Sequence, residues 1–365
     1  MSGPSLDDSR WLDAAVRYAT PFVGTTADNP AVAALVVDPN TQTLVARAVT
    51  AKGGRPHAEA EAIARAGFEA AGCTLYVTLE PCHHWGRTPP CVDAIIRAGI
   101  MRVVIGAADP RTASTSVAQL ESAGIETVLA RHAPSLALHA GHVLRHTAGR
   151  PFVTATLAVS SDGMLGRQGE GRAPVEGAAR QWLDITRSRA DAILVGAATA
   201  RLDNPDLTVA LPGLPGRTPL RVVLAGASGI DRKVNLVGSF SGYRTAIIAE
   251  TGVPVDAPVS VETIRVAGSN GRPDLTAALG ALAERHVQNL FVEPGQRLTA
   301  ALLEADLVDR FVLVTLARTI GPDGVPASPD GPIADLLGAA GLRETGRQAL
   351  GDAGLTRYER LARAD

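Results

Sequence analysis

The chain has 365 residues, of which 46% are hydrophobic and 20% charged. This composition is typical of folded globular proteins and excludes intrinsic disorder, and at roughly 150 residues per domain the length predicts two domains. The 35 basic residues against 37 acidic ones leave a net charge of -2, so no global positive field attracts nucleic acid or an anionic membrane. We therefore expect neither as a partner.

The start of the chain and its cysteines bear on where the protein works. The first twelve residues contain neither a basic nor an apolar segment of the signal-peptide kind, and no later apolar run approaches the ~20 residues of a membrane span. The sequence therefore predicts a soluble, cytoplasmic protein. Its three cysteines are too few for a disulfide framework and indicate metal ligands or catalytic thiols, although Cys73 begins a predicted strand and is expected in the core.

The first half alternates helical and strand-like patterns. A candidate helix cap, Asp7-Asp8-Ser9, precedes the first helical pattern. Strands that alternate with helices favour an α/β layer fold with a largely parallel sheet. The predicted elements are a helix over 11–20, a strand over 31–37, a helix over 57–71, a strand over 73–79, a helix over 90–98, a strand over 103–107, a helix over 117–123, a strand over 126–129 and a helix over 136–145.

A break in the pattern over 147–151 (TAGRP) predicts a boundary between a domain of residues 1–148 and a domain of residues 149–365. The second domain repeats the α/β pattern, without internal repeats. Its predicted elements are a strand over 152–159, a helix over 178–188, strands over 192–196, 221–225, 245–249 and 290–293, a helix over 298–305 and a strand over 310–316.

The strongest functional pattern consists of His57 and Glu59, followed by Cys82 and Cys91. One imidazole and two thiolates are good zinc ligands, and three protein ligands leave the fourth position open for water, as in catalytic zinc sites. His57 and Cys91 each begin a predicted helix, whose positive end helps keep the thiolates deprotonated. Zinc lowers the pKa of bound water toward ~7, and Glu59 is placed to carry protons to a leaving amine. The sequence thus predicts Zn²⁺ and a hydrolytic site with Glu59 as its catalytic residue.

This order of residues resembles the signature of zinc deaminases, H-x-E followed by P-C-x-x-C, except that eight residues and not two separate Cys82 from Cys91. In this spacing the chain resembles the riboflavin-biosynthesis bifunctional deaminase/reductase family, in which an eight-residue insert separates the two zinc cysteines. Further segments also resemble this family: 78–91 (TLEPCHHWGRTPPC), 53–59 (GGRPHAE), 29–32 (NPAV) and 109–110 (DP).

The resemblance implies a three-layer, cytidine-deaminase-like α/β/α domain that hydrolytically deaminates a diaminopyrimidinone ribosylamine 5′-phosphate. It implies that Asn29 binds the pyrimidine edge and that His84 and Arg87 bind the ribose phosphate. A guanidinium such as that of Arg87 suits a dianionic phosphate.

The second half resembles the reductase domain of the same family, which has a dihydrofolate-reductase-like α/β fold. The resemblance implies NADPH-dependent reduction of the ribosyl group to a ribityl chain. A glycine between a strand and a helix, such as Gly295, can also bring backbone amides up to a phosphate. The matching segments include 157–163 (LAVSSDG), 190–199 (ADAILVGAAT), 203–208 (DNPDLT) and 292–295 (VEPG). The residues implied are Val159, Thr199, Asp203 and Gly295 for NADPH, and Arg187, Leu207 and Glu293 for the substrate.

Several positions of this half depart from the usual family residues. The loss of two cations and the gain of a carboxylate weaken the binding of a dianionic substrate, on the order of a few kcal/mol, unless another arginine such as Arg172 compensates. The second domain then either keeps NADPH binding with a repositioned substrate phosphate or serves as a platform for folding and oligomerisation. The departures are Thr156 for Lys, Ala210 for Arg, Pro174 for Trp, Glu176 for Thr and Pro294 for Gly or Ala.

Three alternatives remain open at this point. The first is a deaminase whose second domain has lost or changed its reductase activity. The second is a cytosine, nucleoside or tRNA-adenosine deaminase, against which the long insert, the second domain and the absence of a basic surplus argue. The third is a zinc-stabilised binding protein without chemistry, which the open coordination position and Glu59 disfavour. The family resemblance also implies a homo-oligomer.

Overall fold

A computed structural model of the chain describes residues 4–86, 88–112, 114–212, 217–238 and 242–360. The chain forms two compact units, Met1–Ala148 and Gly149–Asp365, and each is described by itself. No helix in the described ranges is both long and apolar enough to cross a membrane.

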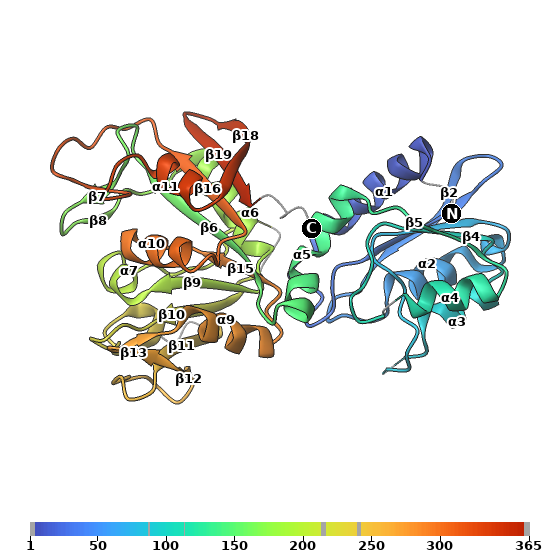
Figure 1. The fold of residues 1–365 in the computed structure, drawn as a ribbon, viewed down its shortest axis with the longest axis horizontal. Coiled ribbons are helices and arrows are strands. Elements are labelled where there is room, and N and C mark those ends of the chain that lie inside the picture. The colour runs from blue at the N-terminus through green and yellow to red at the C-terminus, as the bar shows by residue number, and fades with distance from the viewer. Residues whose placement is uncertain (1–3, 87, 113, 213–216, 239–241, 361–365) are drawn as a thin grey trace. The chain divides into compact units, whose positions relative to one another are not determined.

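The first unit is a five-stranded sheet between two layers of helices (Figure 1). Its strands are β1 (Ala33–Asp38), β2 (Thr43–Val49), β3 (Thr74–Val77), β4 (Arg102–Ile105) and β5 (Glu126–Leu129), in the order β2-β1-β3-β4-β5. Helices α1 (Leu6–Ala19) and α5 (Ala133–Thr147) pack on one face of the sheet. Helices α2 (Ala58–Ala66), α3 (Cys91–Arg97) and α4 (Thr115–Ser122) pack on the other. Short 3-10 turns follow α1 (Thr20–Phe22) and α2 (Gly67–Ala70). The predicted three-layer α/β/α fold is confirmed.

The largely parallel sheet is confirmed except at one strand: β1 pairs antiparallel with both β2 and β3 and so runs against the other four strands, whereas the β3–β4 and β4–β5 pairs are parallel. One expectation for this unit is wrong. The helix α1 begins at Leu6, earlier than predicted, because Ser5 is the cap and not the segment 7–9. The Ser5 hydroxyl accepts a hydrogen bond from the Asp8 amide (3.1 Å), and the Asp8 carboxylate accepts one from the Ser5 amide (2.8 Å).

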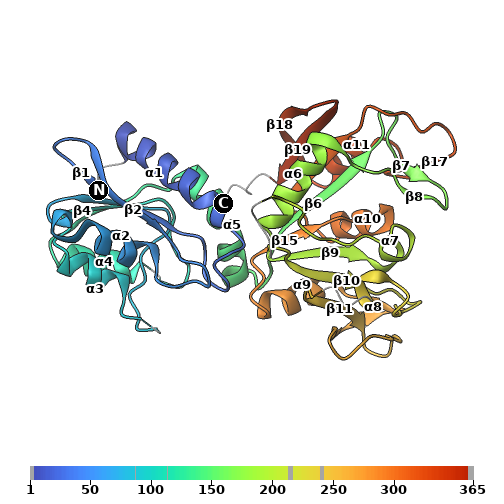
Figure 2. The same cartoon turned by 180° about the vertical axis from the view of Figure 1, so that it is seen from behind.

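The second unit contains a nine-stranded sheet in the order β12-β11-β10-β9-β15-β6-β16-β19-β18, labelled in Figure 1 and seen from behind in Figure 2. It is parallel from β12 to β16 and antiparallel in its last two pairs. The strands are β6 (Phe152–Val159), β9 (Ala192–Gly196), β10 (Leu220–Leu224), β11 (Thr245–Glu250), β12 (Glu262–Val266), β15 (Asn289–Val292), β16 (Arg310–Thr315), β18 (Leu342–Leu350) and β19 (Ala353–Arg360).

Helices pack on both faces of this larger sheet. One face is covered by α6 (Gly177–Ser188), α7 (Ala197–Leu202) and α8 (Asn235–Gly238). The other is covered by α9 (Leu275–Glu284), α10 (Gln296–Glu304) and α11 (Ile333–Ala339). Short strands form two small sheets, one of β7 (Met164–Arg167), β8 (Gly171–Arg172) and β17 (Gly324–Pro326), the other of β13 (Gly268–Ser269) and β14 (Arg272–Pro273).

The topology of the second unit places three strand ends together. Strands β6, β15 and β9 are adjacent and parallel, so their carboxyl ends share one edge of the sheet. From that edge the chain enters α7 at Gly196 and α10 at Gly295. Ligands of open α/β sheets bind at this edge.

Candidate metal centre and second site

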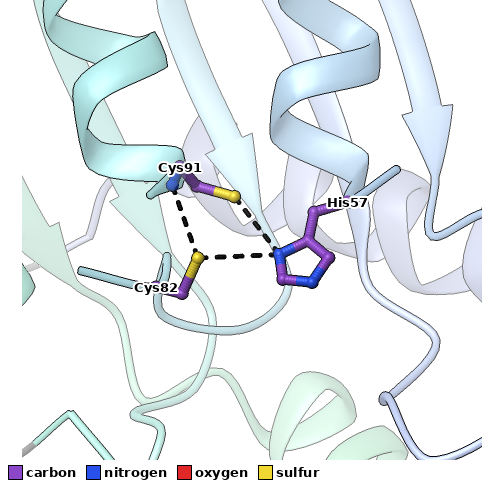
Figure 3. A group of neighbouring side chains, drawn as sticks. All are labelled: His57, Cys82 and Cys91. Atoms are coloured by element: carbon purple, nitrogen blue, oxygen red, sulfur yellow. Dashed lines mark hydrogen bonds between the residues drawn. The ribbon is translucent and has the colours of Figure 1, made fainter. Parts of the chain in front are cut away.

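Two helix starts and one loop bring three donor atoms together in the first unit. His57 Nδ1 lies 3.6 Å from Cys82 Sγ and 3.4 Å from Cys91 Sγ, and all three donors lie within 4.8 Å of one another (Figure 3). An ion held at ordinary zinc distances with tetrahedral angles separates its nitrogen and sulfur ligands by about 3.6 Å. The spacing of these three side chains therefore suits one shared ion, and it is the one such group among the described residues.

Local structure accounts for the placement of each donor. His57 is the N-cap of α2 and Cys91 the first residue of α3, so both helices point their amino ends toward the group. The Cys91 amide donates a hydrogen bond to Cys82 Sγ (3.4 Å). Hydrogen bonds from the Cys91 thiol, from His57 and from the Cys91 amide lower the pKa of Cys82 to about 4. Cys82 is thus a thiolate at neutral pH, the form that binds a metal.

The carboxyl group of Glu59 lies beside this group. Glu59 is in the first turn of α2 and is 3% exposed, and its Oε2 atom has no hydrogen-bond partner among the described residues. Burial raises the pKa of Glu59. A buried carboxyl oxygen without a partner costs stability. Such a group is suited to exchange a proton with a ligand.

The structure also places the predicted substrate residues of this unit. Asn29 packs directly over Gly54, where an added Cβ would lie 2.3 Å from Asn29 Nδ2, and Gly54 has a φ of +91°. Only glycine fits there, and this contact holds Asn29 against the segment that ends at His57. His84 is exposed, and Arg87 lies outside the described residues. Cys73 is 4% exposed and belongs to the core, as predicted.

Sequence interpretation missed two residues that support the centre. Glu80 is 4% exposed and directly precedes Pro81 and Cys82; its carboxylate accepts hydrogen bonds from the Asp109 amide (3.2 Å) and the Ser116 hydroxyl. Glu80 therefore fixes the loop that carries Cys82. The other missed residue is Arg55, whose side chain reaches the same loop from the His57 side. For Glu80 the available signal was its position two residues before Cys82, whereas the contact of Arg55 with Thr88 joins segments 33 residues apart and left no signal.

Two of the predicted substrate residues of the second unit form a buried ion pair. Arg187 on α6 donates two hydrogen bonds to the Glu293 carboxylate, at 2.7 and 2.9 Å, and both residues are 6% exposed. Burial alone raises the pKa of Glu293, but the charge of Arg187 lowers it overall. Arg187 also donates to the Thr208 carbonyl (3.5 Å), next to the buried Leu207, whose φ is +52°. The predicted substrate residues Arg187 and Glu293 thus contact each other. The third, Leu207, directly precedes Thr208, whose carbonyl accepts a hydrogen bond from Arg187.

The residues predicted to bind NADPH lie at strand and helix ends. Val159 ends β6, and an added Cβ on Gly295 would lie 3.1 Å from Thr199 Oγ1, so Gly295 and Thr199 are neighbours. Asp203 accepts a hydrogen bond from the Arg172 amide (2.9 Å) and binds its guanidinium.

The structure describes all five positions that depart from the usual family residues. Thr156 is 4% exposed and its hydroxyl donates to the Val312 carbonyl (2.9 Å), which satisfies it within the sheet. Pro294 is buried, whereas Pro174, Glu176 and Ala210 are exposed. The guanidinium of Arg172 is already bound to Asp203. Arg172 is therefore a poor replacement for the arginine that the family usually has where Ala210 stands.

Two domain families match the chain. "Cytidine and deoxycytidylate deaminase zinc-binding region" matches residues 6–107, and "RibD C-terminal domain" matches residues 151–352. Riboflavin biosynthesis protein RibD of Escherichia coli is 31% identical over 338 residues, which cover 87% of this chain and 90% of that protein. The protein of the same name from Mycobacterium tuberculosis is 39% identical over 227 residues, covering 60% of this chain and 66% of its own.

Solved structures agree with these matches. Acinetobacter baumannii RibD superimposes with a TM-score of 0.84 at 25% identity and covers 98% of this chain and 99% of its own. A diaminohydroxyphosphoribosylaminopyrimidine deaminase/5-amino-6-(5-phosphoribosylamino)uracil reductase from Thermotoga maritima superimposes with a TM-score of 0.82 at 26% identity, covering 97% and 99%. With both halves matched in this order, the chain belongs to the RibD family of riboflavin biosynthesis enzymes, which join a zinc-binding deaminase domain to a reductase domain.

Proposed function

We propose that the first unit hydrolytically deaminates the diaminopyrimidinone ribosylamine 5′-phosphate and that the second unit reduces the ribosyl group of the product to a ribityl chain with NADPH. The observation that carries this proposal is the cluster of His57 Nδ1, Cys82 Sγ and Cys91 Sγ beside the buried Glu59. The name of the Thermotoga maritima relative supports the choice of substrate.

The donor set of the first unit fits zinc. One imidazole and two thiolates leave one tetrahedral position open, as in catalytic zinc sites. When bound there, zinc supplies the Lewis acidity that lowers the pKa of water toward about 7. The role of Glu59 follows from its unsatisfied Oε2 atom: it accepts a proton from the attacking water and delivers it to the leaving amine.

Three residues position the pyrimidine phosphate. The Asn29 side-chain amide offers both a donor and an acceptor to the pyrimidine edge. Packing against Gly54 holds the Asn29 side chain next to the segment that ends at His57. His84, exposed in the loop between the two cysteines, and Arg87 of the same loop bind the ribose phosphate.

In the second unit, NADPH supplies a hydride when bound, and the carboxyl edge of β6, β15 and β9 is where we expect it. The amino end of α10, which begins after Gly295, presents free amides to a phosphate. The residues assigned to the cofactor are Val159, Thr199, Asp203 and Gly295. The residues assigned to the substrate are Arg187, Leu207 and Glu293.

One observation favours a second candidate, a deaminase whose second unit no longer reduces the substrate. Neutral residues, Thr156 and Ala210, stand where the family usually carries cations, and Arg172 is engaged by Asp203. A dianionic substrate therefore finds fewer cations in the second unit than in other members of the family.

One experiment decides between the candidates. Purified, zinc-loaded protein receives the diaminopyrimidinone phosphate and NADPH, and ammonia and NADPH absorbance are followed together. The proposed bifunctional activity predicts ammonia release followed by equimolar NADPH loss. Ammonia without NADPH loss supports the deaminase alone, and no ammonia contradicts both candidates.

We further propose a cytoplasmic homo-oligomer, as the family resemblance implies. The three thiols, all free among the described residues, suit a reducing compartment. Light scattering of the purified chain tests the oligomer, because a monomer mass across concentrations contradicts it.

A further inference from the structure

Arg55 links the segments that carry two of the three metal-binding candidates. It stands two residues before His57, and its Nη1 atom donates a hydrogen bond to Thr88 Oγ1 at 2.5 Å, three residues before Cys91. Its Nη2 atom lies against Gly86, where an added Cβ would be 3.2 Å away. The guanidinium therefore sits over the loop between the two cysteines.

The guanidinium of Arg55 is a charge without an acidic partner among the described residues. Its side chain makes no ion pair with any residue that the structure describes, and Thr88 takes one of its five N–H donors. Arg55 is half-buried. Arg102, another half-buried arginine of this unit, pairs with Asp8. A partly buried cation with free donors and no acid favours an anionic ligand.

The neighbours of Arg55 show where such a ligand would lie. Gly54, the preceding residue, carries the Asn29 side chain against its Cα, and His57 follows two residues later. Asn29, the metal-binding group and the Arg55 guanidinium thus surround one stretch of five residues, 53–57. A ligand bound at Asn29 would therefore lie beside the segment that carries Arg55 and His57.

We infer that Arg55 binds the 5′-phosphate of the deaminase substrate, an inference that rests on the proposed function. A guanidinium offers two parallel donors to a phosphate and stays charged at any working pH. The bond to Thr88 leaves the other edge of the guanidinium free and fixes its plane. Arg55 thereby favours phosphorylated over unphosphorylated pyrimidine substrates.

The test compares two substrates, the ribosylamine phosphate and its phosphate-free counterpart, in the wild-type protein and in Arg55→Gln. The variant should lose roughly 10- to 100-fold in kcat/KM for the phosphorylated compound and change little for the other. Inorganic phosphate should also inhibit the wild-type protein competitively and Arg55→Gln more weakly. Arg55→Lys keeps the positive charge but lacks the two parallel N–H donors. Its kcat/KM for the phosphorylated compound should lie between those of the wild-type protein and Arg55→Gln.

Two controls separate phosphate binding from loop support. Thr88→Val removes the hydrogen bond that fixes the guanidinium plane but keeps the cation, so it should lower kcat/KM for the phosphorylated compound by less than Arg55→Gln does and leave the other compound nearly unchanged. Arg97→Gln makes the same charge change at the far end of α3, on an exposed side chain, and should leave the substrate ratio unchanged. Zinc content measured in each variant reports an intact site.

Equal losses for both substrates in Arg55→Gln, with zinc retained, would overturn the inference and assign Arg55 to loop support alone. The proposed function fails separately. In that case the wild-type protein releases no ammonia from either compound, and the inference falls with it.

Discussion

The substitution Glu59→Gln isolates the proton-carrying role of one carboxyl group. Glutamine has nearly the same shape as glutamate, so the first turn of α2 and the position of His57 should not change. Because the carboxyl is 3% exposed and its Oε2 atom has no partner among the described groups, the change breaks no hydrogen bond of that atom. Burial already raises the pKa of Glu59, so ionising it is costly, and the neutral variant should be at least as stable as the wild-type protein at neutral pH.

The expected loss of activity is large. Positioned general acid–base groups contribute roughly 10²- to 10⁴-fold, which corresponds to about 3–5 kcal/mol of barrier. We therefore expect the rate of ammonia release to fall by more than ~100-fold, with zinc content unchanged. Glu61→Gln is the matched control, because it makes the same change one half-turn further along α2 in a carboxylate that pairs with Arg65. This control should retain nearly full activity.

The assay is the initial rate of ammonia release at saturating substrate, with zinc content and thermal midpoint measured on the same samples. A Glu59→Gln variant with full activity and full zinc would refute the assigned role. Loss of zinc together with activity would instead show that Glu59 supports the metal centre, which also contradicts the reasoning.

Three further predictions concern the ion pair, the metal and pH. Arg187→Met leaves Glu293 buried without its partner and should lower the free energy of unfolding by about 3–5 kcal/mol in denaturant titrations, more than Glu293→Gln does; equal losses would contradict this. Chelation of zinc should abolish ammonia release and lower the thermal midpoint, and added zinc should restore both; full activity of the chelated protein would argue against a metal site. Burial lowers the pKa of His139 to about 3, so between pH ~6.5 and ~3 the unfolded chain binds a proton that the folded chain does not, and stability should fall by about 1.4 kcal/mol per pH unit as the pH decreases. His139→Gln should flatten this slope in pH-dependent melts, and an unchanged slope would assign it to other groups.

The metal-binding candidates could be predicted from the sequence because their chemistry is local. An imidazole and two thiols near predicted helix starts already specify a ligand set, and the structure brings His57, Cys82 and Cys91 within reach of one ion. The buried strands could be predicted equally well, since residues 33–37 of β1 and 103–105 of β4 are continuous apolar runs.

Elements with one exposed face escaped prediction. Strand β2 and the hairpin of β18 and β19 carry polar and charged residues on their solvent side, so no apolar run marks them. Because β2 was missed, the antiparallel β1–β2 pair and the reversed direction of β1 were not expected. The hydrogen bond between Arg55 and Thr88 was also hidden, because it joins segments 33 residues apart. Such a contact depends on tertiary packing and not on any local pattern.

The metal centre is tested most directly by X-ray absorption at the zinc edge of the purified chain. We predict one zinc ion per chain with two sulfur neighbours at about 2.3 Å and two nitrogen or oxygen neighbours at about 2.0 Å, one of them from solvent. The sulfur signal should drop to one neighbour in Cys82→Ser. A spectrum without sulfur, or with four protein ligands and no exchangeable position, would contradict the account.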